Sequence, residues 1–403
     1  MSFNEIVEAF IRDCSEHSMN ALVTFAQNNS LTDHEIAFLA RRMAESGTVM
    51  NLREPYKYTD IPSTGGPTSL STILCPLFLV LLGYRVPKLA VPGRPAGGID
   101  IMAQIPDYRI SFGRNEINDI LDECGYAHFL ATDMFVPLDG KLYAYRKRIG
   151  AINIPELAIA SLLSKKIAVG LKRIGLEIRV APHGNFGGSW DNAKNNARKF
   201  IKVATLLDIK SVCFLTNALE PYQPYIGRGE SLIALEHILD DTYNEWLKKH
   251  AMMCFAMARS TTGLDVAYDA LSSGKVKQIF KHHLLSQGSS YDRFLDKVHD
   301  IRTTPHEIII SDKEGFVVVD LPLLRDILVK LQNSATPSYL SFPDPAGITL
   351  YKNMGDYVNK GEEIASVRYI SSLKGCVVAE IKRTLFIKDN PGLSGHYEEV
   401  TNA

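Results

Sequence analysis

The sequence predicts an α/β protein with three parts: a small all-α domain, a larger α/β domain with a mainly parallel central sheet, and a C-terminal α+β segment. Three observations support this prediction. The first fifty or so residues carry helix signals; from Arg53 onward, Gly/Pro/Ser-rich turns alternate with helical stretches and short strand-like runs. From about Pro305, strand signals become more frequent. Alternation of helices and strands is typical of a layered fold with a parallel sheet.

Helix starts are recognisable in the N-terminal part. Ser2 with Glu5, and Thr32 with Glu35, have the spacing of a capping box, in which the two residues satisfy free N–H groups at a helix start. After the second box, apolar residues recur at the spacing of one helix face: Ile36, Leu39, Ala40 and Met43. These segments are therefore expected to form packed helices.

Strands and hinges are expected farther along the chain. The runs "LEIRVAP" (176–182) and "SVCFLTN" (211–217) predict strands of the α/β part, and "EGFVVVDL" and "GEEIASVRY" predict strands of the last segment. The turn-rich stretches Pro55–Ser63 and Ala131–Tyr143 are the expected hinges.

Composition excludes several classes of protein. The chain has 403 residues, of which 46% are hydrophobic and 22% charged, as in folded proteins with a large core. The net charge of −1 argues against a surface dedicated to nucleic acid or membrane. The apolar run Ile73–Leu82 contains Pro76 and falls short of the roughly 20 residues of a membrane span.

The spacing of the cysteines and the composition of the N-terminus indicate in which cellular compartment the protein is expected. The six cysteines are far apart, with no C-x-x-C pair, so neither a metal cage nor a disulfide framework is expected: Cys14, Cys75, Cys124, Cys213, Cys254 and Cys376. The stretch "MSFNEIVEAFIRDC" contains acidic residues and has no apolar core of a signal peptide. A cytoplasmic protein is expected.

A first candidate site is the loop "PSTGGPTSLST". Ser63, Thr64, Gly65, Gly66 and Ser71 lead into an apolar segment, and such a turn before a helix can hold an anion on free N–H groups. Because Ser and Thr are also favoured helix caps without any ligand, a purely structural role remains an equal alternative.

Two further loops carry single candidates. In "VPGRPAGGIDIMAQIP", Arg94 can meet an anion, although an ordinary turn with a solvated arginine is the simpler interpretation. In "APHGNFGGSWDNAKNNARKF", His183 is a possible general base, although a lone loop histidine is more often a surface residue.

A helix is expected from Pro155, a residue favoured in the first turn. Within it, Ser161 and Lys165 are i, i+4 neighbours that interrupt an apolar sequence, so their face meets either water or a polar ligand. Together they can read a planar hydrogen-bonding ring. Lys166 and Lys172 are interpreted as solvated charges.

These motifs together resemble the nucleoside phosphorylase II family, that is, thymidine phosphorylase and pyrimidine-nucleoside phosphorylase, with anthranilate phosphoribosyltransferase as a remoter relative. "DIPSTGGPTSLSTILCPL" is similar to the family's D-K-H-S-T-G-G-V-G-D-x-x-S-L-x-L-x-P-x phosphate loop. "LYAYRKRIGAINIPELAIASLLSKKIA" resembles L-Y-A-x-R-D-x-T-A-T-V-x-S-I-P-L-I-x-x-S-I-x-S/A-K-K-L-A. "MAESGTVMNL" and "PGRPAGGIDIMAQIP" match further family segments, so the resemblance spans almost the whole chain.

The resemblance implies a pyrimidine site. The family's three ring-reading residues fall on Arg146, Ser161 and Lys165, at matching spacing. They would hydrogen-bond the edge of a uracil or thymine. Arg146 and Lys165 would also act as catalytic residues, by stabilising the charge that develops on the leaving pyrimidine.

The family's phosphate loop, by contrast, is degraded here. Its lysine and histidine fall on Ile61 and Pro62, while two serines are kept as Ser63 and Ser71 and the loop arginine as Arg94. Each buried charge-assisted contact is worth roughly 1.5–3 kcal/mol, so ordinary phosphate affinity is not expected to survive. Restoring lysine and histidine at 61 and 62 is expected to bring back some phosphate dependence.

Other family positions are also changed. The serine and threonine of the second loop fall on Pro92 and Gly98, and the glutamate that some members use near a potassium ion falls on Ser231. No cofactor and no metal are therefore expected.

The expected function is cleavage or transfer at the N-glycosidic bond of a pyrimidine nucleoside or close analogue, by a glycosyltransferase-like or hydrolase-like enzyme. Inorganic phosphate is not expected to act in the family's usual way, and water or another acceptor would replace it. Two alternatives stay open: a phosphorylase with a rebuilt phosphate site, and a non-catalytic protein that binds a pyrimidine nucleoside or nucleotide.

The resemblance also implies the division of the chain and its assembly. Residues 1–52 and 136–170 would form the small α domain, 56–132 and 173–304 the α/β domain, and 305–403 the C-terminal segment packed on it. The family's members are homodimers through the α domain, so a homodimer with a small-molecule substrate is expected.

Overall fold

The computed structural model describes residues 1–64, 66, 68–93, 97–131, 134–182, 184–268, 273–334, 342–391 and 397–401. Gly65, Arg94 and His183, three candidates from the loops, lie outside the described residues.

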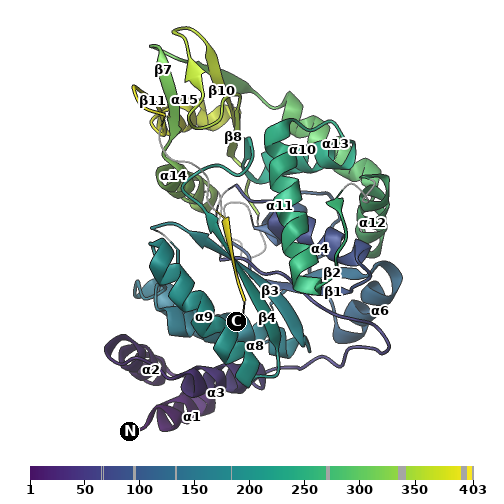
Figure 1. Ribbon diagram of the computed structural model, residues 1–403, viewed down its shortest axis with the longest axis vertical. Helices are drawn as coiled ribbons and strands as arrows, with labels where there is room; N and C mark the ends of the chain where they lie inside the picture. Colours follow the sequence, from purple (N-terminus) through teal and green to yellow (C-terminus); the bar gives the residue numbers. More distant parts are fainter. Residues whose placement is uncertain are drawn as a thin grey trace.

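The N-terminal residues form three helices at the bottom of Figure 1, α1 (Phe3–Asp13), α2 (Glu16–Asn28) and α3 (Asp33–Ala44). The two predicted capping boxes are confirmed, because Ser2 and Thr32 each accept a hydrogen bond from the third helical residue and receive one back. Two later helices join this part, α7 (Pro137–Arg148) and α8 (Pro155–Ala168), and α8 packs on α3. Pro155 opens α8, as the sequence predicts.

The central sheet is built from two parallel ladders. β1 (Val86–Ala90) pairs with β2 (Tyr126–Leu130), and β3 (Arg173–Val180) pairs with β4 (Lys210–Asn217). β12 (Tyr397–Val400) adds to the outer edge of β4 in antiparallel direction. Both strands predicted in this part are confirmed, and β3 begins three residues earlier than the run that predicts it.

An extended segment, residues 58–63, lies between the two ladders. Its Tyr58 bridges Arg85 next to β1, and its Asp60 and Ser63 bridge β3, all in parallel direction. Pro55–Ser63, expected to be a hinge, therefore contributes an almost strand-like element to the middle of the sheet. In the other expected hinge, Ala131–Tyr143, the second half belongs to α7.

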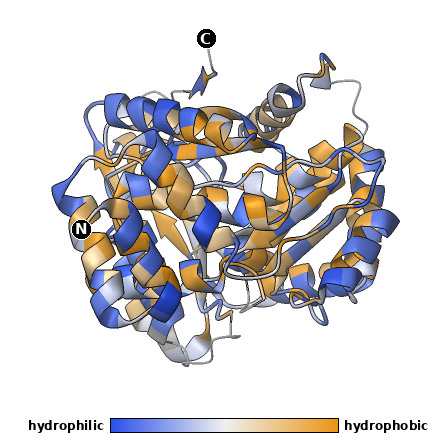
Figure 2. Ribbon diagram, turned by 90° about the horizontal axis from the view of Figure 1, so that it is seen from below, coloured by the Kyte–Doolittle hydropathy of each residue, from blue (hydrophilic) through white to orange (hydrophobic). Residues whose placement is uncertain are grey.

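Helices cover the sheet on both faces, and their apolar sides meet the apolar strands in the interior (Figure 2). The helices that contact its strands are α4 (Ser71–Leu81), α5 (Gly98–Met102), α6 (Arg114–Cys124), α9 (Trp190–Leu206) and α11 (Glu245–Thr262). Three more helices pack on other helices of this part: α10 (Arg228–Leu239), α12 (Ser273–Ser286) and α13 (Tyr291–Thr303). No helix in the described ranges has the length and apolar character needed to cross a membrane.

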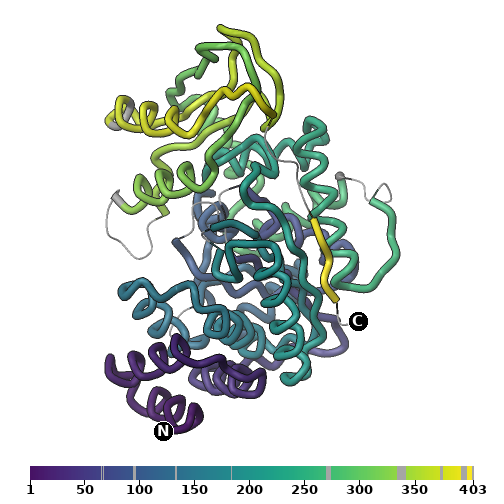
Figure 3. The backbone as a smooth tube through the Cα atoms, turned by 60° about the vertical axis from the view of Figure 1, so that its left-hand side comes forward, coloured from purple at the N-terminus to yellow at the C-terminus, as the bar shows by residue number. Residues whose placement is uncertain are grey.

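The C-terminal part has its own apolar core and stands at the top of Figures 1 and 3. One antiparallel sheet has the order β5 (Tyr225–Ile226), β8 (Ala346–Leu350), β10 (Glu363–Tyr369), β6 (His306–Ile310). The other has the order β11 (Leu385–Lys388), β7 (Gly315–Val319), β9 (Tyr357–Val358). Helices α14 (Leu321–Ser334) and α15 (Lys374–Lys382) and the 3-10 turn Ser371–Leu373 complete this part. The predicted mixed α/β fold is thus confirmed, while the domain boundaries stay a prediction.

Candidate functional site

A cavity of about 1020 Å³ opens where the parallel strands end. Residues that follow β1, β2 and segment 58–63 line it, together with side chains of α7 and α8 and a few residues of α14. Loops at the carboxyl ends of parallel strands are the usual place for a ligand in such folds. Six of the predicted site residues line the cavity: Ser63, Thr64, Gly66, Arg146, Ser161 and Lys165.

The α7–α8 wall brings the predicted ring readers together. The Lys165 ammonium donates to the Ser161 hydroxyl at 2.9 Å, which confirms that the two share one helix face, and it also pairs with Asp139 of α7. Arg146 is 2% exposed, and its guanidinium donates to the carbonyls of Ala151 and Ile152 at 3.1 and 2.6 Å. Burial lowers the pKa of Arg146. With Asp139 included, this wall presents two cations, one carboxylate and a hydroxyl to the cavity, and these groups carry a net charge of +1.

A second group of charges lies on the floor of the cavity. The carboxylate of Asp60 accepts from Lys88 at 2.7 Å and from Lys166 at 2.6 Å. Burial alone would raise the pKa of Asp60, but the two ammonium groups outweigh it and hold this pKa at about 2. The interpretation of Lys166 as a solvated charge is wrong, because its side chain is 3% exposed and pairs with Asp60. The group carries a net charge of +1.

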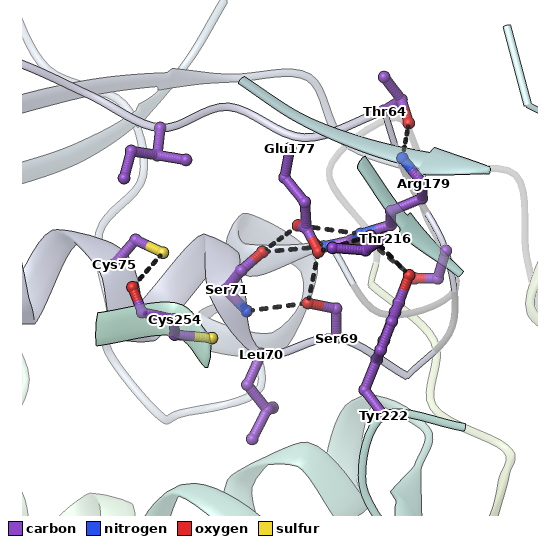
Figure 4. Close-up of polar contacts among 12 residues, drawn as sticks. Thr64, Ser69, Leu70, Ser71, Cys75, Glu177, Arg179, Thr216, Tyr222 and Cys254 are labelled. Carbon is purple, nitrogen blue, oxygen red and sulfur yellow. Dashed lines mark hydrogen bonds and ion pairs between the residues drawn. The ribbon is translucent and has the colours of Figure 1, made fainter. Parts of the chain in front are cut away.

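The loop that is expected to be a degraded phosphate loop rests on a buried ion pair that sequence reasoning missed (Figure 4). Arg179 and Glu177, both on β3, pair at 2.9 Å, and Ser71 donates to Glu177 and accepts from Arg179 at 3.0 Å. The Thr64 hydroxyl accepts from the Arg179 backbone N–H at 3.0 Å. The hydroxyl of Ser71 is therefore engaged inside the protein, and Ser71 is missing from the described lining of the cavity.

Ile61, the position onto which the resemblance places the family's lysine, does not face the cavity. Ile61 is 0% exposed and belongs to the apolar core under α4, whereas its neighbours Asp60 and Pro62 line the cavity. This alternation is that of an extended chain, whose successive side chains point to opposite faces. Gly66 also lines the cavity, and a Cβ there would meet Arg179 Cδ at 3.1 Å.

Several residues of the cavity wall that the sequence did not single out carry buried polar atoms without a described partner, and Thr72 and His128 are among them. Among the residues that the structure describes, none hydrogen-bonds Thr72 Oγ1 on α4 or His128 Nε2 on β2, although both atoms are buried. They converge on Gly98, where a Cβ would lie 2.9 Å from Thr72 Oγ1 and 3.0 Å from His128 Cε1. No motif spacing marks them, because one comes from a helix start and the other from a strand.

The side chains of Ser231 and of its neighbour Glu230 are both engaged inside the protein. The Ser231 hydroxyl donates to the carbonyl of Gly227 at 2.6 Å, within the first turn of α10. The carboxylate of Glu230 accepts two hydrogen bonds from the guanidinium of Arg368, at 2.5 and 3.0 Å.

Comparison with known proteins finds relatives over most of the chain. The pyrimidine-nucleoside phosphorylases of Staphylococcus epidermidis and Geobacillus stearothermophilus are 23% and 24% identical, covering 86% and 90% of this chain and 82% and 86% of theirs. The thymidine phosphorylase of Agrobacterium fabrum is 26% identical, covering 91% of this chain and 87% of its own. No protein-family model matches the chain.

Solved structures with the same fold are anthranilate phosphoribosyltransferases. That of Thermus thermophilus superposes with a TM-score of 0.54 at 14% identity, covering 75% of this chain and 96% of its own. That of Saccharomyces cerevisiae, in complex with PRPP and Mg, gives 0.52 at 13% identity, with coverage of 74% and 94%. At these identities the likeness shows the fold.

Proposed function

Because the chain is a divergent relative of the pyrimidine-nucleoside and thymidine phosphorylases, we propose that it breaks the N-glycosidic bond of a pyrimidine nucleoside and transfers the pentosyl group to an anionic acceptor. The observation that carries this proposal is the surplus of buried positive charge at two places in one cavity. One place is suited to the base and the other to the acceptor.

The α7–α8 wall is suited to the base. As the bond between the anomeric carbon and the ring nitrogen breaks, its electron pair stays on the pyrimidine, and negative charge spreads to the ring oxygens. The hydrogen bonds of Arg146 to described residues go to carbonyl oxygens, and Lys165 lies beside Ser161. Fixed cations in a site shielded from water stabilise such charge without reorganising.

The floor is suited to the acceptor. Lys88 and Lys166 share the one carboxylate of Asp60, so one buried positive charge is left over. A buried charge that is not compensated costs several kcal/mol, and an anionic ligand would remove that cost. In this proposal the acceptor is held by lysines of β1 and α8, and not by a lysine at position 61 as the resemblance would place it. This agrees with the expectation that the phosphate loop is degraded. Water as acceptor gives no reason for this surplus.

The test is the release of free base from thymidine, uridine and deoxyuridine, followed by chromatography with and without added inorganic phosphate. We expect release that requires phosphate and yields a pentose 1-phosphate. Release in phosphate-free buffer, with free pentose as product, would instead indicate hydrolysis. Absence of release in both buffers, together with uracil binding in calorimetry, would indicate a binding protein. A homodimer through the α domain is proposed on the same relationship, and sedimentation would measure it.

A further inference from the structure

A chain of buried rings leads from the interior to the cavity. His283 Nδ1 lies 2.9 Å from the carbonyl oxygen of Tyr126, and a carbonyl only accepts, so Nδ1 carries the proton. Burial lowers the pKa of His283 to about 3, so the ring is neutral and its Nε2 accepts from the hydroxyl of Tyr108 at 2.8 Å. The protonation of this histidine is thus assigned by its partners.

The next contact in the chain assigns the proton of His128. The Tyr126 hydroxyl lies 3.0 Å from His128 Nδ1, and burial lowers the pKa of His128, so this ring is also neutral. Within the described part of the chain, His128 Nδ1 is the atom to which the Tyr126 hydroxyl can donate its proton in a hydrogen bond. A buried hydroxyl that donates is favoured over one left unsatisfied, so Tyr126 donates to Nδ1 and the proton of His128 sits on Nε2.

Nε2–H of His128 is therefore a fixed donor in the wall of the cavity. His128 is 0% exposed and lines the cavity, and its Nε2 has no hydrogen-bond partner in the described ranges. Lys88 is its register partner on the neighbouring parallel strand, so the two side chains leave the sheet on the same face. Thr72 Oγ1, also without a described partner, lies next to Gly98 as well.

We propose that His128, Thr72 and Lys88 form the binding site for the acceptor, an inorganic oxyanion of the phosphate class, and this inference rests on the proposed function. The N–H of His128 and the hydroxyl of Thr72 would donate to two of its oxygens, and Lys88 would supply charge. A cation is excluded as the ligand by Lys88 and by the imidazole N–H. Inorganic phosphate, with four oxygens, can accept from all three groups at once.

Gly98 supports the same site from the backbone side. Any side chain at this position would press on Thr72 Oγ1 and His128 Cε1, both about 3 Å from its Cβ. The hydroxyl that the family's threonine would offer at position 98 thus has no room here. The donors come instead from α4 and β2, which approach the same point in space.

The test compares phosphate binding of two variants of equal size, His128→Gln and His128→Met, by calorimetry with inorganic phosphate. Both lose the contact to Tyr126, but the glutamine amide keeps a donor near the place of Nε2. We expect the methionine variant to bind phosphate about 10- to 100-fold more weakly than the wild type, and the glutamine variant to keep most of the affinity. Thr72→Val, which keeps the shape of the side chain, should lose about tenfold.

Uracil binding, measured in the same samples, separates this inference from the proposed function. Unchanged uracil affinity with weakened phosphate affinity supports the site. Phosphate affinity unchanged in both His128→Met and Thr72→Val, or absent in the wild type while uracil binds, would overturn the site and leave the base-binding function standing. Absence of uracil binding in the wild type would overturn the proposed function itself. If the His128 variants do not fold, Thr72→Val alone decides.

Discussion

Lys88 and Lys166 place their ammonium groups on the two oxygens of a single buried carboxylate, that of Asp60, at 2.7 and 2.6 Å. The three side chains come from β1, α8 and segment 58–63, so one charge cluster joins the sheet to the helical wall of the cavity. The shared carboxylate stabilises both ammonium groups, so the loss of Asp60 should destabilise the protein more than the loss of either lysine.

Asp60→Asn should therefore lower the free energy of unfolding by about 3–5 kcal/mol, since it leaves two buried ammonium groups without an anion. Removing one of them as well, in Asp60→Asn with Lys166→Met, should recover a large part of the loss. Urea unfolding measures both effects. Asp119→Asn is the matched control, because Asp119 pairs with Arg53 at the surface and should cost less than about 1 kcal/mol. An equal loss of unfolding free energy in Asp60→Asn and Asp119→Asn would contradict the stabilising role of Asp60.

The same carboxylate predicts a pH dependence. The pKa of Asp60 is lowered from 3.8 to about 2 in the folded protein, so its stabilisation is complete above pH 4 and is lost as the pH falls towards 2. The expected contribution is about 2 kcal/mol. Urea unfolding at several pH values should show a smaller loss in the double variant, which has no carboxylate at position 60. If the free energy of unfolding changed equally with pH in the wild type and in the double variant, the lowered pKa of Asp60 would be refuted.

Lys165→Ala should weaken the binding of uracil or thymine by about 10- to 100-fold, because a charged donor to the ring is removed. Calorimetry with the free base measures this. Lys141→Ala serves as the control, since Lys141 is exposed at the rim of the same cavity and should leave the affinity unchanged. If both variants bind the base as the wild type does, Lys165 does not read the ring.

Ile61→Lys should destabilise the protein by about 3 kcal/mol or more and should not increase phosphate affinity, because residue 61 faces the apolar core. The sequence alone predicts a partial return of phosphate dependence when lysine and histidine are restored together at positions 61 and 62. Pro62→His is the control, because residue 62 faces the cavity and tolerates a polar side chain better. A gain of phosphate binding in Ile61→Lys would show that segment 58–63 can rotate.

Gly98→Ala should cost about 1–3 kcal/mol of stability, since its Cβ would lie within about 3 Å of Thr72 and His128. Gly140→Ala, at an exposed site in α7 with nothing within 4 Å of its Cβ, should instead stabilise the protein slightly. Thermal unfolding compares the two. A Gly98→Ala variant as stable as Gly140→Ala would mean that Thr72 and His128 are not held against Gly98.

Local sequence rules predict several parts of this structure well. The caps at Ser2 and Thr32, the helix start at Pro155 and the i, i+4 pair of Ser161 with Lys165 depend on residues close together in the chain. The strand of residues 173–180 is also visible from its apolar run. Predicting these features does not require knowing which helices and strands pack together.

The residues that the sequence left out depend on long-range contacts. Lys166 resembles a solvated lysine until Asp60, more than a hundred positions away, is placed beside it. Glu177 and Arg179 stand two residues apart on one face of a strand, and this alternation within "LEIRV" is the signal that could have revealed their pair. For His128 and Thr72 no local signal exists, because only the fold brings them to Gly98.

The position of β12 at the edge of β4 has a consequence for how the chain folds. β12 follows every other described strand in sequence, yet it pairs with a strand of the central sheet after the chain has passed through the C-terminal part. Until it is synthesised and returns, the N–H and C=O groups along the outer edge of β4 have no strand to pair with. During synthesis, the incomplete chain would thus expose an unpaired strand edge that is prone to aggregation. Nascent chains on neighbouring ribosomes would be the first partners available to pair with this edge.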